Sequence, residues 1–126
     1  MNQARDAYLS KARESLTGAH SELLNGRLNN AANRAYYAVF QAAVAALIHA
    51  GIGRPRWYHD DVQALFASEL TRRRKLYGAD MRDTIYDLYE VRITADYKQE
   101  APSRRRVERA IREANAFVKA VEERMT

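Results

Sequence analysis

The chain has 126 residues, a formal net charge of +5 and no cysteine. This length suits a single domain, 1–126, that buries about two-thirds of the surface of the unfolded chain. The lack of cysteine excludes disulfides, thiolate metal sites and a cysteine nucleophile, and it fits a reducing compartment. No charged and apolar leader opens the sequence, so we expect a cytoplasmic protein, and the positive charge permits an acidic partner such as RNA.

The first predicted helix runs from about Asn2 to Asn25, because apolar residues recur along it at helical spacing. Gly26 is placed to end this helix in the left-handed conformation. We expect Asn29 or Asn30 to cap a second helix that continues to about Ala50.

The second predicted helix is the centre of the chain. From Ala35 to Gly53 there is no Asp, Glu, Lys or Arg, and the stretch is apolar on nearly all sides. A helix of this kind is buried by its neighbours. A membrane-spanning alternative is poor, because Gln41, His49 and two tyrosines interrupt a run that is barely long enough to span a bilayer.

Three further helices follow from the same helical spacing. They are a short helix after the Gly51–Pro55 breaker, capped by Asp60 or Asp61; a helix over about Ala79–Ala95, preceded by a basic link, Arg72–Lys75, that Gly78 closes; and a last helix with Ser103 as its N-cap. The sequence therefore predicts an all-α, up-and-down bundle of about five helices.

Two groups of residues place an arginine beside the core. Arg34 and Tyr37 share a face of the central helix with Gln41. Arg92 stands where the fourth helix calls for an apolar residue, and Asp96 lies one turn further on, beside Tyr97. Because Arg92 lies on the inward stripe, we expect it to be mostly buried and paired with Asp96 or another acid. A buried guanidinium must be paired, so each arginine either holds a phosphate or makes a structural ion pair, and both interpretations of its role stay open.

His59 precedes a helix N-terminus, where backbone N–H groups attract anions, and a histidine there can act as an acid or a base. The alternative is a partly exposed histidine without a role. No Glu-x-x-His pair has the spacing of a di-metal site in a bundle, so we expect neither a metal nor a cofactor.

Arg104, Arg105 and Arg106 fill the first turn of the last helix. Three guanidiniums at the positive end of a helix dipole can bind phosphate, and with Arg72–Lys75 they are compatible with an RNA track. The alternative is a solvated run of charge.

These residues resemble a known family. The segment Asn33–Phe40, then His59, then Val91–Tyr97 are similar to the HEPN domain, in particular to its small stand-alone prokaryotic branch with an Arg-x-Tyr-Tyr-Ala helix and a later Arg-x-x-x-Asp-Tyr. The resemblance covers nearly the whole chain. It implies a helical bundle that usually dimerises and that in many members is encoded beside a minimal nucleotidyltransferase as a toxin–antitoxin pair. Catalytic members of the family cut RNA with an Arg-x4–6-His motif that two protomers bring together.

The chain departs from that motif at one position. Arg92 matches the arginine, but Tyr97 stands where the shortest spacing places histidine, and no histidine follows His59. Cleavage through a 2′-hydroxyl needs a base and an acid, and an ordinary phenol is a poor base. His59 is then the remaining proton carrier for a metal-independent endoribonuclease.

Two functions follow from this resemblance. The first is a toxin–antitoxin-type homodimer that binds RNA and cleaves it, with Arg34, Arg92 and Asp96 facing the phosphate and His59 and Tyr97 beside them. The second is a non-catalytic interaction module that partners a nucleotidyltransferase or binds a nucleotide. We expect no contact with a membrane.

Overall fold

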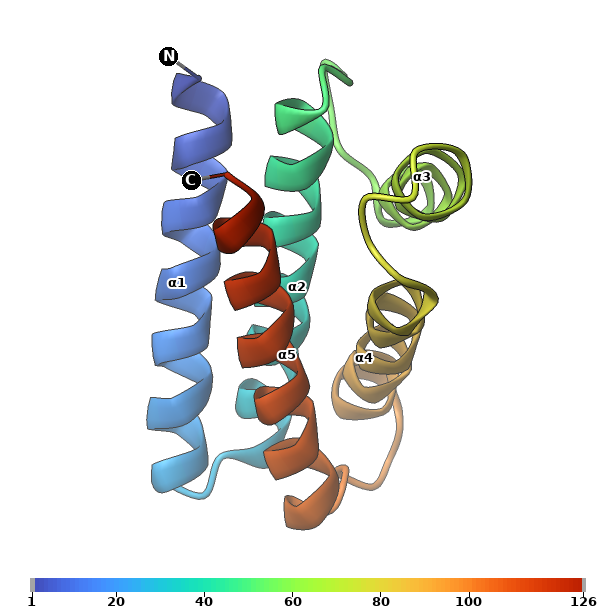
Figure 1. Cartoon of the computed structure of the whole chain (residues 1–126). Coiled ribbons are helices and arrows are strands. Elements are labelled where there is room, and N and C mark those ends of the chain that lie inside the picture. The colour runs from blue at the N-terminus through green and yellow to red at the C-terminus, as the bar shows by residue number, and fades with distance from the viewer. Residues whose placement is uncertain (1, 126) are drawn as a thin grey trace.

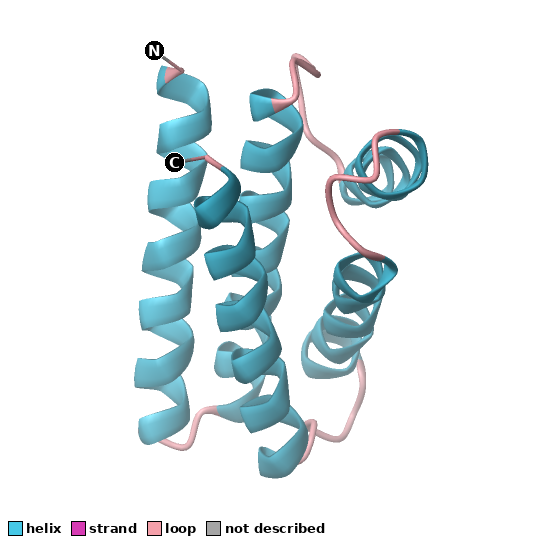
Figure 2. Ribbon diagram, viewed as in Figure 1, coloured by secondary structure: helices cyan, strands magenta, loops and turns pink. Residues whose placement is uncertain are grey.

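The computed structural model describes residues 2–125, and every regular element in that range is helical (Figure 2). The elements are α1 (Gln3–Leu24), α2 (Leu28–His49), α3 (His59–Leu65), η1 (Phe66–Arg73), α4 (Ala79–Tyr97) and α5 (Arg104–Arg124). The predicted all-α bundle of about five helices is confirmed, since η1 continues α3 without a break.

The helices pack around α2. Helices α1, α2 and α5 lie side by side, α4 leans against α2 and α5, and α3 crosses beside them (Figure 1). The start of α1 and the end of α5 lie at the same end of the bundle (Figure 1). Among the described residues, no helix combines the length and apolar character that crossing a membrane requires.

The central helix is buried by its own chain. Every residue from Ala42 to Leu47 is buried, and α2 packs against α1, α4, α5 and α3. Alanines on most sides of α2 let these helices approach closely, which is why a nearly uncharged stretch occupies this position. The apolar surface of α2 is therefore covered within the chain, and the predicted homodimer would have to use another surface.

The predicted turn at Gly26 and cap at Ser103 are confirmed. Gly26 has φ +73°, the left-handed region that glycine enters without strain. The Ser103 hydroxyl accepts a hydrogen bond from the backbone N–H of Arg106 at 3.1 Å and so caps α5.

Two other predicted helix starts were wrong by two or three residues. Arg27 is the N-cap of α2, and its carbonyl already accepts from Ala31 N at 3.0 Å, so Asn29 and Asn30 lie inside the first turn. Turn geometry after Gly26 thus decided the start, although asparagine is the better capping residue.

The start of α3 also differs from the prediction. Tyr58 is its N-cap and His59 its first residue, which places Asp60 and Asp61 in the first turn. Carboxylates suit this position because they complement the positive end of the helix dipole.

The basic link before α4 was predicted incorrectly. Arg72 and Arg73 belong to η1, a π-helical segment, and the chain turns at Lys75, which has φ +54°. Gly78 closes the link as predicted: it has φ −73° and is the N-cap of α4, which begins at Ala79. A π-helix has no sequence signature of its own, so its extent was not predictable.

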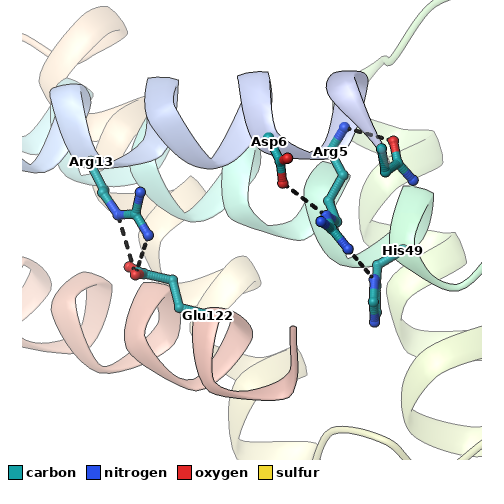
Figure 3. Close-up of polar contacts among 6 residues, drawn as sticks. Arg5, Asp6, Arg13, His49 and Glu122 are labelled. Carbon is teal, nitrogen blue, oxygen red and sulfur yellow. Dashed lines mark hydrogen bonds and ion pairs between the residues drawn. The ribbon is translucent and has the colours of Figure 1, made fainter. Parts of the chain in front are cut away.

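Polar contacts tie α1 to its neighbours (Figure 3). Arg13 pairs with Glu122 of α5. Arg5 Nη1 donates to His49 Nδ1 of α2 at 3.0 Å and also pairs with Asp6. His49 is therefore occupied by a structural contact at one end of the bundle.

Candidate functional site

An aromatic cluster lies where α2, α3 and α4 meet. Its rings contact one another with centroid separations of 4.9–6.1 Å. The members are Tyr36, Tyr37, Phe40, His59 and Tyr89. Three of the rings, Tyr36, Tyr37 and Phe40, belong to α2. Tyr37 and Phe40 follow Tyr36 by one and four residues, so all three point toward the start of α3 and the middle of α4.

Arg92 is held inside this cluster. Its guanidinium carbon lies 5.6–5.9 Å from the ring centroids of Tyr36, Tyr37, Tyr89 and Tyr97, and its side chain is 12% exposed. Such contacts between a cation and aromatic faces are strongest when the cation is shielded from water.

Arg92 also forms the expected ion pair. Its Nε lies 3.1 Å from Asp96 Oδ2, one turn further along α4. The prediction that Arg92 is mostly buried and paired with Asp96 is therefore confirmed. The Nε–H is nevertheless buried without a hydrogen bond, because the carboxylate does not lie along its direction.

His59 is enclosed by the rings of Tyr36, Tyr37, Phe40 and Tyr89. Its Nδ1 makes a 2.7 Å hydrogen bond with the Tyr36 hydroxyl, which fixes the orientation of the imidazole. Burial, and then the nearby Arg92 cation, lower the pKa of His59 from its usual range, against a smaller opposite effect of Asp60. His59 is accordingly neutral at pH 7 and able to accept a proton.

The Tyr36 hydroxyl stays protonated in this environment. Burial raises the pKa of Tyr36 far above its ordinary value, although the nearby Gln63 side chain and the charge of Arg92 act in the opposite direction. Tyr36 is fully buried, so it positions His59 and has no surface open to a ligand.

Asn33 connects the two predicted groups of residues. Its Nδ2 donates to Asp96 Oδ2 at 3.1 Å, and its Oδ1 accepts from Arg34 Nη2 at 2.8 Å and from Arg34 Nε at 3.2 Å. A continuous polar chain therefore runs from Arg34 through Asn33 and Asp96 to Arg92. Asn33 begins the Asn33–Phe40 motif, and its position directly before Arg34 is the signal in the sequence that points to this contact.

Arg34 and Gln41 lie on a different side of α2 from the aromatic cluster. They line a groove between α1 and α2, and the buried Ser15 hydroxyl of α1 contacts the Gln41 side chain at 2.8 Å. The Tyr37 ring stands between the two sides, with Arg34 5.1 Å from its centroid and Arg92 5.6 Å.

Tyr97 lies at the edge of the site. Its side chain belongs to the last turn of α4, is 68% exposed, and touches the Arg92 guanidinium only through its ring. It therefore does not reproduce the proton-transfer position that a histidine would take.

The residues Arg92, Asp96 and His59, with the rings around them, form what we call the Arg92 centre. The basic run at the start of α5 does not reach this centre. Arg106 Nη2 donates to the Asp87 carbonyl at 3.5 Å on the flank of α4 that faces α5, and Arg104 Nη1 reaches the Leu23 carbonyl at 3.5 Å. Arg92 faces α2 instead. Arg105 is exposed.

The other basic run, Arg72–Lys75, lies at the opposite end of α4, a helix of 19 residues. Such a helix is about 28 Å long at 1.5 Å per residue. The two runs that the sequence joined in one RNA track are thus separated by the length of α4 (Figure 1). Within residues 2–125, no group of three or more His, Asp or Glu side chains is arranged to hold a metal ion.

Comparison with known protein families identifies the class of protein to which this helical bundle belongs. Residues 6–124 match the HEPN domain family, so the chain belongs to this family. It is also similar to a UPF0332 protein of Thermotoga maritima, with 33% identity over 113 residues that cover 89% of this chain and 83% of that protein.

Proposed function

We propose that this HEPN protein binds RNA at the Arg92 centre and acts in a toxin–antitoxin-type pair with a nucleotidyltransferase. The observation that carries the proposal is the buried Nε–H of Arg92, which makes no hydrogen bond although Asp96 lies 3.1 Å away. Unsatisfied buried donors are uncommon in folded proteins, and a phosphate oxygen is a strong acceptor for a guanidinium. Family membership supports the choice of RNA.

Cleavage of the bound RNA rests on His59. The lowered pKa of this imidazole leaves it free to take the proton of a 2′-hydroxyl at neutral pH. The 2′-oxygen then bonds to the phosphorus and displaces the 5′-oxygen, which takes a proton from water, so the products are a 2′,3′-cyclic phosphate and a 5′-hydroxyl. The Arg92 cation lies close enough to influence His59 electrostatically, and a guanidinium there stabilises negative charge that develops on a phosphate. This is a metal-independent reaction with Asp96 and Tyr97 at the margin of the site.

The test uses total RNA with the wild-type protein, Arg92→Met and His59→Gln. Arg92→Met keeps the volume of the side chain and should abolish RNA binding, because it removes the phosphate donor. His59→Gln should retain binding and lose cleavage. Arg112→Gln, which removes one exposed cation of α5, is the matched control. Unchanged binding by Arg92→Met would remove Arg92 from the functional site.

A non-catalytic interaction module is the second candidate. Asp96 already neutralises Arg92, and Tyr97 replaces the histidine of the family's cleavage motif. Either function would be served by a homodimer with the outer face of α4 near the two-fold axis, where Tyr86 and Tyr97 are 41% and 68% exposed. RNA that is bound but stays intact favours the module, and a monomer at micromolar concentration in sedimentation counts against the dimer.

A further inference from the structure

The amide of Gln63 is a buried polar group that the proposed reaction does not use. Gln63 follows His59 by one turn of α3, so the two side chains share a face of that helix. Its Nε2 is buried and has no hydrogen-bond partner among the described residues. Buried donors of this kind are uncommon, because they give up their hydrogen bonds to water, and each one calls for an explanation.

Gln63 and His59 meet at one hydroxyl, that of Tyr36. This hydroxyl makes a 2.7 Å hydrogen bond with His59 Nδ1, and the Gln63 side chain lies close enough to act on the pKa of Tyr36. Tyr36 is fully buried, so its hydroxyl bonds to protein groups and not to bulk water. The direction of the hydrogen bond to His59 therefore depends on what Gln63 offers to the Tyr36 hydroxyl.

A phenol donates one hydrogen bond, and this leaves two arrangements. If Tyr36 donates to His59 Nδ1, neutral His59 carries its proton on Nε2, which is then only a donor. If Tyr36 donates to Gln63 Oε1, His59 Nδ1–H donates to the Tyr36 oxygen, and His59 Nε2 keeps a free lone pair. Since Nδ1 is occupied by Tyr36 in both cases, only the second arrangement lets His59 accept a proton from a substrate.

The unpaired Gln63 Nε2 favours the second arrangement. This nitrogen makes no hydrogen bond to the Tyr36 oxygen beside it. Turning the amide about its Cγ–Cδ bond exchanges Nε2 and Oε1. The exchange places an acceptor next to the Tyr36 hydroxyl and takes the nitrogen away from the position in which it is unpaired.

We propose that Gln63 is a positioning residue that acts through Tyr36 and holds neutral His59 in the tautomer with its proton on Nδ1. The hydrogen bonds then run in one direction, from His59 to Tyr36 and from Tyr36 to Gln63. This inference rests on the proposed role of His59 in RNA cleavage, because it supplies the basic Nε2 which that role needs. The tautomer itself is measurable without RNA.

NMR of the full chain labelled with ¹⁵N at histidine tests the tautomer. An imidazole nitrogen that carries a proton resonates far from one that does not. Spectra are recorded at mildly alkaline pH, where His59 is neutral, and His59→Gln identifies its signals among those of His20 and His49. The wild type should carry the His59 proton on Nδ1, and a proton on Nε2 overturns the proposal.

Variants of Gln63 test whether this residue sets the tautomer. Gln63→Met removes the acceptor, so the Tyr36 hydroxyl should donate to His59 instead and the imidazole proton should move to Nε2. Gln63→Glu keeps an acceptor and should keep the wild-type tautomer. Gln41→Met, which replaces a half-buried glutamine on the other side of α2, is the matched control and should leave the His59 signals unchanged.

A Gln63→Met protein that keeps the proton on His59 Nδ1 overturns the proposal. Gln63→Leu, which also lacks the acceptor, gives the same test if Gln63→Met does not fold.

RNA cleavage separates this proposal from the proposed function. Gln63→Met should bind RNA as the wild type does and cleave it at least about tenfold more slowly, since general base catalysis typically contributes 10²–10⁴-fold. Gln63→Glu should recover most of that rate. If Gln63→Met cleaves as fast as the wild type, Gln63 does not position the base. If the wild type does not cleave RNA, the proposed role of His59 fails, and the NMR result alone decides whether Gln63 sets the tautomer.

Discussion

The two sides of α2 hold an arginine in different ways. On the side facing α3 and α4, large rings close around Arg92, and Asp96 balances its charge. On the side facing α1, Ser15 and Gly18 leave an open groove, and Arg34 contacts an amide instead of a carboxylate. The size of the opposing side chains decides whether the arginine is packed or accessible.

This difference separates two kinds of chemistry on one helix. The aromatic side fixes His59 and Arg92 within a dense cluster, which suits positioning and proton transfer. The groove side leaves donors of Arg34 without an acceptor in the part of the chain that the structure describes. Asn33 lies between them and is bonded to both.

The largest expected effect on stability comes from removing a buried ring from the aromatic side. Tyr36 is fully buried at the centre of the cluster, so Tyr36→Ala should lower the free energy of unfolding by about 3–5 kcal/mol. Gln41→Ala on the groove side should cost only about 1 kcal/mol, since it loses chiefly the contact with Ser15. Chemical denaturation of both variants measures the contrast, and equal costs would show that the groove side is packed just as tightly.

Removing the carboxylate of the buried ion pair should have the next largest effect. Asp96→Asn leaves the guanidinium of Arg92 without its counter-charge; because Asp96 is 26% exposed, we expect a loss of about 1–3 kcal/mol rather than the full cost of a broken buried pair. Arg92→Met should cost less, about 1 kcal/mol or below, as a hydrophobic side chain of similar volume replaces the charge. Denaturation curves would contradict this order if Arg92→Met were the less stable variant.

Acidic pH should lower the free energy of unfolding through the protonation of His59 on the aromatic side. Its pKa is lowered in the folded protein, so below the ordinary value of about 6.5 the unfolded chain binds the proton more readily. The contribution of His59 to stability is therefore complete above pH 6.5 or so and is lost as pH falls through the lowered folded pKa. Unfolding followed between neutral and acidic pH should show a shallower decline in His59→Gln than in the wild type.

Filling space on the groove side should stabilise the protein slightly. Gly18 lies inside α1, where alanine is a better helix former by about 0.8–1.0 kcal/mol. The added Cβ would meet Arg34 carbons at 3.6 Å, an ordinary contact. In thermal unfolding, Gly18→Ala should be more stable than the wild type by up to about 1 kcal/mol. A loss of stability would indicate that the Arg34 stem has no freedom to adjust.

The sequence was enough to predict the helices and the pairing of Arg92 with Asp96, but not how the surroundings of the two arginines differ. The inward spacing of Arg92 and the Asp96 one turn later were enough to predict a buried ion pair. The enclosure of His59 by four rings was not, because it depends on how α3 crosses α2. Nor could the pattern show that Arg34 faces a groove while Arg104 and Arg106 are tied to backbone carbonyls. Such contacts join residues that lie far apart in the sequence. They depend on how the helices pack, and the helical spacing of apolar residues within one segment does not determine that.

The smallest expected effect tests whether exposed arginines bind anything. Arg105 lies in the first turn of α5 and makes no ion pair among the described residues, so Arg105→Gln removes an unfavourable cation from a helix N-terminus. Stability should rise by about 0.3–1 kcal/mol at low ionic strength. If this arginine also contacts a phosphate of single-stranded RNA, the slope of log affinity against log salt should flatten by about 0.7. A gain in stability with an unchanged slope would show that Arg105 is only part of the solvated surface.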